Sequence, residues 1–213
     1  RPVGRLDQET SGIVVFAKNQ VAASRLQSVK SPCKIHKQYL AAVSDTLPVD
    51  MPGVWHTLDL PLMQDPENHL KMKTAADLSL HSSALSGKIK TAVTHYHTLF
   101  SSQDWSLITL KLDTGRTHQI RAHFKSIRHP LFNDPEYGGN EILKGTTFTK
   151  YKQFVQNCFA LCPRQALHAK TLGFEHPGTG KWMDFNSEIP QDIQQLIEKW
   201  RGYVANRELE DIE

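Results

Sequence analysis

The N-terminal stretch constrains the fold most, because a polar loop runs directly into an apolar segment. Residues 1–12 are mostly polar and include Asp7, and the run Ile13–Ala17 follows without a break. A short apolar run rich in β-branched residues, bounded by polar residues, predicts a buried strand. We therefore expect Asp7 on a loop at the end of a core strand, where a rigid scaffold can hold a reactive side chain. An ordinary solvated aspartate is the simpler alternative.

The composition is that of an ordinary globular protein. The chain has 213 residues, of which 39% are hydrophobic and 22% are charged. No apolar run approaches the roughly 18 residues that span a bilayer. Three cysteines disfavour a disulfide framework, so we expect a reducing cytoplasm. The net charge of +3 permits a nucleic-acid partner without requiring one.

Hydrophobic periodicity predicts the remaining elements. Alternation indicates strands over residues 34–43, 55–60, 90–100, 105–112, 166–174 and 181–185. Helical spacing indicates helices over 20–29, from Thr117 as N-cap, and from Ile189 onwards. Residues 62–90 are interpreted mainly as exposed turns, and 141–156 as a surface insertion.

Strands joined by short turns, without a repeated strand–helix–strand pattern, predict an α+β fold. We expect a mixed, mostly antiparallel sheet flanked by helices. One domain is expected over residues 1–205, and residues 206–213 are expected to form an acidic, solvated and mobile tail.

Five segments of the chain resemble, in order, the signature segments of the RluA family of RNA pseudouridine synthases. These segments are Gly4–Gly12, Lys37–Ala41, Thr114–His123, His129–Gly138 and the pair Leu167–Ala169 with Phe174–Pro177. A single such segment would be a weak signal, whereas five in the family's order are specific. The resemblance covers residue 4 to about residue 190. Many members carry histidine where this chain has Gly4. The family's catalytic domain also normally begins some tens of residues earlier, so we expect an N-terminal strand region to be missing.

The resemblance implies a role for each catalytic residue. Asp7 is implied to be the catalytic nucleophile or essential carboxylate, Arg121 to pair with it, and Tyr39 to lie beside the target uracil. By position in a strand alone, Tyr39 would be a packing residue. Each chemical route needs an ionised aspartate in a site that excludes water, and a neighbouring arginine favours that charged form.

The resemblance also implies the residues that bind RNA. An enzyme acting on a paired uridine must flip it out of the helix, and Arg5 is implied to fill the gap that the base leaves. A simple phosphate contact is the alternative for Arg5. Arg116 and His118 either contact RNA or only fix their loop. Metal binding by histidines 118 and 123 or by cysteines 158 and 162 is disfavoured, because the cysteine pair has no partner pair and the histidines belong to the matched family motif.

We therefore predict a pseudouridine synthase that modifies rRNA or tRNA, without metal or organic cofactor and without membrane association. We also expect a cytoplasmic monomer. Two alternatives stay open: a non-catalytic RNA-binding relative of the same fold, and a metal-dependent nuclease, which would need clustered carboxylates.

Overall fold

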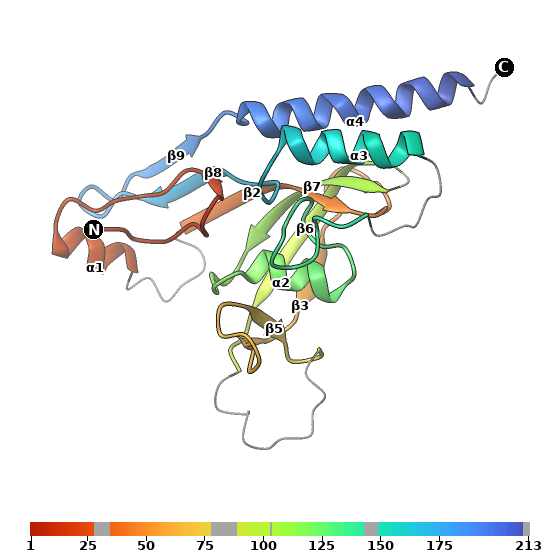
Figure 1. The fold of residues 1–213 in the computed structure, drawn as a ribbon. Helices are drawn as coiled ribbons and strands as arrows, with labels where there is room; N and C mark the ends of the chain where they lie inside the picture. Colours follow the sequence, from red (N-terminus) through yellow and green to blue (C-terminus); the bar gives the residue numbers. More distant parts are fainter. Residues whose placement is uncertain (28–34, 78–88, 103, 143–148, 211–213) are drawn as a thin grey trace.

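A seven-stranded sheet forms the centre of the protein in the computed structural model (Figure 1), which describes residues 1–27, 35–77, 89–102, 104–142 and 149–210. Its strands lie in the order β1-β8-β2-β7-β6-β3, with β9 also paired to β8. The strands are β1 (Ser11–Gly12), β2 (Ile35–Ser44), β3 (His56–Asp59), β4 (Leu62–Gln64), β5 (Met72–Thr74), β6 (Val93–Ser101), β7 (Trp105–Leu112), β8 (Leu167–Glu175) and β9 (Trp182–Asn186). The helices are α1 (Gln20–Gln27), α2 (Gln119–Ser126), α3 (Thr149–Leu161) and α4 (Gln191–Glu210).

The predicted fold class is confirmed. β1 pairs with β8 in parallel, and the other pairings in the large sheet are antiparallel. The hairpin β6–β7 and the strands β2, β3, β8 and β9 lie where alternation predicts them. Among the helices in the described ranges, none is long and apolar enough to cross a lipid bilayer.

The two faces of β2 are buried against different layers. Leu40 and Ala42 pack with α3 and α4, whereas Tyr39, Ala41 and Val43 pack on the side of α2. This division follows from the strand geometry, because successive side chains point to opposite faces of a sheet. Figure 1 shows α3 and α4 side by side along one side of the sheet, with α2 on the other.

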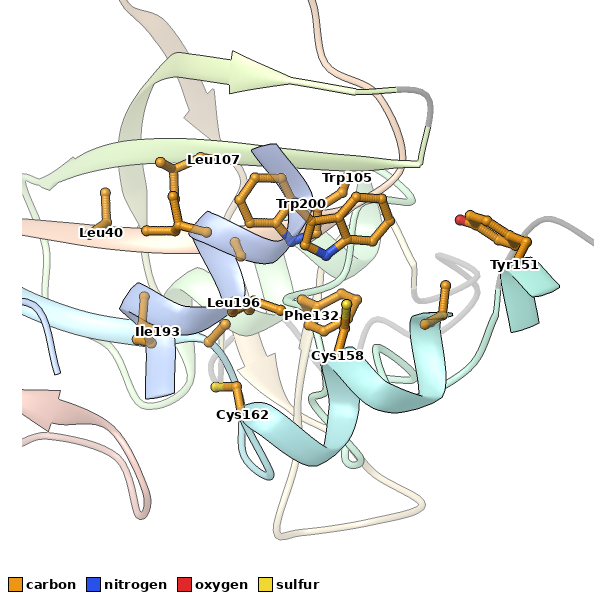
Figure 2. Packing of buried hydrophobic residues seen from close by; sticks show 14 residues of the cluster. Leu40, Trp105, Leu107, Phe132, Tyr151, Cys158, Cys162, Ile193, Leu196 and Trp200 are labelled. Atoms are coloured by element: carbon orange, nitrogen blue, oxygen red, sulfur yellow. The ribbon is translucent and has the colours of Figure 1, made fainter. Parts of the chain in front are cut away.

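The layer formed by α3 and α4 closes the larger core cluster (Figure 2). Trp105 of β7 stacks on Trp200 of α4 with ring centroids 5.6 Å apart and planes inclined by 9°. Offset aromatic stacks of this kind stabilise a core beyond the area that they bury. Cys158 and Cys162 are free thiols buried in the same cluster.

The prediction of a buried strand over Ile13–Ala17 is wrong. Of the N-terminal segment, Ser11–Gly12 pairs with β8, and Ile13 N adds one bond to Ala169 O. The rest of the run bonds to the first residues of the chain, through Val3 N to Val15 O and Ala17 N to Arg1 O. Val14 is 38% exposed and Phe16 64% exposed, whereas Ile13 and Val15 pack beside β8. The apolar run therefore has one covered face instead of two.

Three further predictions need correction. The predicted surface insertion, residues 141–156, overlaps α3, whose buried positions Tyr151, Val155 and Cys158 have helical spacing. The helical pattern was not recognised because the predicted insertion ends at residue 156, before Cys158. Residues 62–90 include the small hairpin β4–β5, while residues 78–88 lie outside the described residues. The expected tail is helical as far as Glu210, because α4 continues through it, and residues 211–213 lie outside the described residues.

Candidate active site

Asp7 begins a tight turn that a backbone hydrogen bond closes. The amide of Thr10 donates to the carbonyl of Asp7 at 3.0 Å, and Glu9 adopts a left-handed backbone with φ of 66°. Gly12 has φ of 120°, and a β-carbon there would overlap the backbone of Ala169 in β8. A glycine is therefore required where the loop meets the sheet. The Asp7 side chain is left half-buried.

Asp7 and Tyr39 line one cavity of about 320 Å³. The remaining walls come from the N-terminal loop, from β2, and from the loop that joins β7 to α2, with Lys37, Asp113 and Arg116 among the lining residues. Three segments far apart in the sequence thus meet at one site.

Tyr39 is held in place by the centre of the sheet. Its backbone lies between β7 and β8, and its side chain is only 6% exposed. Burial, and then the negative charge of Asp7, raise the pKa of Tyr39 to about 12. The phenol is therefore protonated at neutral pH, and Tyr39 lines the cavity as a neutral residue.

Lys37 is a cavity residue whose role our sequence analysis missed. It lies two residues before Tyr39 on the same face of β2, and burial lowers the pKa of its ammonium group. A β-carbon on Gly4 would lie 2.7 Å from Lys37 Nζ, so the absence of a side chain at position 4 makes room for this ammonium. The spacing of two in a strand was the signal that could have identified it.

Gln119 fixes the loop that carries Arg116. Its carbonyl oxygen accepts from Thr114 Oγ1 at 2.8 Å and from the amide of Arg116 at 3.0 Å. Its amide nitrogen donates to Val93 O at 2.9 Å and to Thr94 Oγ1 at 3.0 Å. The side chain is 2% exposed, so these bonds satisfy a buried amide and attach the loop to β6.

The predicted RNA-binding residues surround this loop. Arg5 and Arg116 are exposed; the first lies 3.5 Å from Thr117 Oγ1, and the second donates to Thr91 O at 2.9 Å. His118, and not Thr117, is the N-cap of α2; it has φ of 50° and no side-chain capping bond. Burial lowers the pKa of His118, and the negative charge of Asp7 acts in the opposite direction.

The predicted pairing of Arg121 with Asp7 is wrong in this structure. The guanidinium binds both oxygens of Asp134 at 2.6 and 2.8 Å, and Glu136 at 2.5 Å. Because Arg121 is 4% exposed and Asp134 is 0% exposed, each buried charge requires a close partner. Asp134 follows α2 by a short connection and supplies that partner. Arg121 lies on α2 beside Gln119 and Ile120, which line the cavity, but it is not a lining residue itself.

Across the described parts of the chain, His, Cys, Asp and Glu side chains form no group of three or more that could hold a metal ion. The metal-free and cofactor-free chemistry stays a prediction.

The arrangement defines an α+β protein with a carboxylate–tyrosine cavity at the side of a mostly antiparallel sheet. The chain matches the family described as RNA pseudouridylate synthase over residues 1–126, and it belongs to that family. This confirms the resemblance to the RluA group.

Curated relatives agree with this assignment. The chain is 36% identical over 200 residues to ribosomal large subunit pseudouridine synthase D of Zymomonas mobilis, covering 92% of this chain and 54% of that protein. It is 34% identical over 199 residues to the uncharacterized RNA pseudouridine synthase YlyB of Bacillus subtilis, covering 93% of this chain and 55% of that protein. The chain therefore spans about half the length of these curated relatives.

A solved structure shows the same fold. Human RNA pseudouridylate synthase domain containing 4 superposes with a TM-score of 0.68 at 24% identity, over 94% of this chain and 75% of that one. At this identity the likeness concerns the fold alone.

Proposed function

We propose that this chain isomerises uridine to pseudouridine in RNA. The observation that carries the proposal is the shared cavity of Asp7 and Tyr39, built from the segments that identify the family. The reaction breaks the bond between C1′ and N1 of the uridine, turns the base and joins C1′ to C5. A proton leaves C5 and a proton is gained at N1, so that no oxidant, reductant or second substrate is consumed.

Asp7 is the proposed essential carboxylate. It lies half-buried next to the buried ring of Tyr39, where it can approach the sugar or the base. Attack at C1′, attack at C6 and removal of a sugar proton all use an ionised carboxylate. The geometry of the free protein leaves these three routes open.

Tyr39 is proposed to hold the uracil and to pass on a proton as a neutral hydroxyl. With its pKa raised to about 12, the phenolate is scarce at neutral pH, which disfavours direct action as a base. Its hydroxyl can instead donate to, or accept from, a water that takes the proton at C5. The ring supplies an aromatic face of the kind on which extruded bases stack.

The cations of the cavity are proposed to bind the RNA backbone around the flipped nucleotide. Arg5 and Arg116 are exposed and project from two loops, and Lys37 lies deeper on β2. Arginine combines stacking with phosphate contacts, which suits the expected entry of Arg5 into the base stack. Arg121 is proposed to act indirectly, by fixing α2, whose residues Gln119 and Ile120 line the cavity, through its bonds to Asp134 and Glu136.

The proposed substrate is ribosomal RNA, with tRNA as the alternative. Relatives named ribosomal large subunit pseudouridine synthase D favour large-subunit rRNA. The predicted monomeric state and cytoplasmic location stay predictions.

The test is tritium release from [5-³H]uridine-labelled large-subunit rRNA and tRNA, with and without EDTA. We expect release by the wild type in both conditions and none by Asp7→Asn, which keeps the shape of the side chain and removes its charge. Glu198→Gln, a matched change on the exposed side of α4, should behave as the wild type. Binding of RNA without release by the wild type would favour the non-catalytic alternative, and release abolished by EDTA would contradict the metal-free mechanism.

A further inference from the structure

The backbone of the Asp7 loop is held from the far end of the chain. Between Asp7 and β1, the carbonyls of Gln8 and Glu9 both accept hydrogen bonds from side chains of the segment that leads from α3 into β8. Glu9 is in the left-handed region, which non-glycine residues adopt reluctantly, so this loop needs external support to keep its shape.

Gln165 supplies the first support. Its side-chain amide nitrogen donates to Gln8 O at 2.6 Å and lies 3.3 Å from Thr10 Oγ1. The residue is 2% exposed, so water cannot replace these contacts easily. Gln165 holds the loop on both sides of Glu9.

Arg164 supplies the second support. Its guanidinium donates to Glu9 O at 2.9 Å and to Ser11 Oγ at 3.1 Å. The same group binds both carboxylate oxygens of Asp192, at 2.7 and 3.1 Å, in the first turn of α4. The planar fork of arginine suits this paired geometry, and the carboxylate fixes its orientation.

Ser11 extends the chain of contacts into the sheet. Its hydroxyl lies 3.0 Å from His168 Nδ1. Because Arg164 can only donate to the hydroxyl oxygen, the hydroxyl proton is left for one of two acceptors, His168 Nδ1 at 3.0 Å or Leu167 O at 3.4 Å. Burial lowers the pKa of His168, which agrees with a neutral ring that accepts at Nδ1.

We propose that Arg164 and Gln165 are positioning residues for the reaction, and that Asp192 makes α4 part of the same device. We call these three residues the loop clamp. The inference rests on the proposed function, because it assigns the loop clamp the task of placing the Asp7 carboxylate. None of the three lines the cavity. They act through the backbone of residues 8–11.

The loop clamp should affect the chemical step more than the binding of RNA. Its members contact the loop from behind and leave the exposed cations Arg5 and Arg116 untouched. A displacement of about 1 Å at a reacting group can lower a rate by about 100-fold. We therefore expect a loss in kcat with little change in KM, which is the pattern of an interaction that matters in the transition state.

The first variant is Gln165→Glu, which keeps the side-chain shape but places a carboxylate oxygen against Gln8 O. We expect kcat for pseudouridine formation to fall about 10- to 100-fold, with KM and RNA affinity within about twofold of the wild type. Amide hydrogen exchange at residues 8–12 should become faster, because the support of the loop is lost.

The second variant is Asp192→Asn, which removes the charge that orients Arg164 while leaving the buried amide of Gln165 in place. A smaller loss in kcat, about 3- to 10-fold, is expected with the same change in loop exchange. Gln194→Ala, on the exposed side of α4 and bonded to Glu198, is the matched control and should change neither quantity.

The outcomes separate the two proposals. If the wild type forms no pseudouridine, the proposed function fails, while loop exchange in the variants still tests the loop clamp. If the wild type is active and both variants keep its kcat and its loop exchange, the loop clamp is refuted. A rise in KM with unchanged kcat would likewise overturn the positioning role, because it would place these residues in RNA binding.

Discussion

The buried ion pair of Arg121 and Asp134 permits a quantitative prediction of stability. The substitution Arg121→Met keeps much of the apolar part of the arginine side chain but leaves Asp134 without its cation. Asp134 is 0% exposed, and its side chain loses two hydrogen bonds of 2.6 and 2.8 Å. Removing one partner of a buried pair typically costs about 3–5 kcal/mol.

The neighbouring contacts place the expected loss at the lower end of this range. Asp134 still accepts from the amides of Glu136 and Tyr137 at 3.1 and 3.3 Å, which offsets part of the loss. The Glu136 side chain is 40% exposed, so water replaces its bond to Arg121 and adds less than about 1 kcal/mol. We expect the free energy of unfolding to fall by about 3 kcal/mol.

Urea unfolding followed by tryptophan fluorescence measures this loss, because Trp105 and Trp200 are stacked in the core. In the double variant Arg121→Met with Asp134→Asn, at least about 1 kcal/mol should return, since no charge is then buried alone. A loss below about 1 kcal/mol in Arg121→Met, or no recovery in the double variant, would refute the reasoning.

Three further predictions concern single side chains. Gly12→Ala should lower the free energy of unfolding, measured in a thermal melt, by at least about 2 kcal/mol, because the added methyl group would meet the backbone of Ala169 and φ is 120°. Gly115→Ala, which has open space around its β-carbon, is the control and should cost less than about 1 kcal/mol. Folding raises the pKa of Tyr39 to about 12 from 10.0, so the folded state binds the phenol proton more tightly and the free energy of unfolding should fall between pH 10 and 12. In urea titrations across this range, Tyr39→Phe should show a smaller fall, and an equal fall would contradict the assignment of the raised pKa to Tyr39. Burial raises the pKa of Cys158 to about 12 and of Cys162 to about 11, so iodoacetamide at pH 8 should modify them only after unfolding, as peptide mapping can show; rapid labelling of the folded protein would disprove their burial.

Alternating hydrophobicity predicted the strands best where both faces of the sheet are covered by other layers of the protein. In β2, the alternating burial of Leu40 and Tyr39 against different layers matches the period of the strand. The run Ile13–Ala17 has the composition of a central strand but lies beside the first residues of the chain. Hydrophobicity alone does not say how many neighbours a strand has.

The candidate site could be predicted only as far as the resemblance reached. It named Asp7 and Tyr39, which line one cavity and which neither period nor composition brings together, and their catalytic roles stay predictions. The partner of Arg121 was mispredicted, because a buried guanidinium takes the carboxylates that the fold places closest. The role of Arg164 and Gln165 is not readable from the sequence, because their contacts run to backbone carbonyls and leave no pattern of side-chain types.

The contacts between the Asp7 loop and the segment that leads into β8 also have a consequence for folding. Gln165 and Arg164 lie 157 and 155 residues beyond the carbonyls that they hold. Contacts at such separation carry a large loop-closure entropy and tend to form late, after local hairpins such as β6–β7. During synthesis the loop leaves the ribosome before Arg164 and Gln165, so it stays without these anchors until they have followed. A nascent chain that stops short of Arg164 would therefore carry Asp7 on a loop that lacks both of these supports.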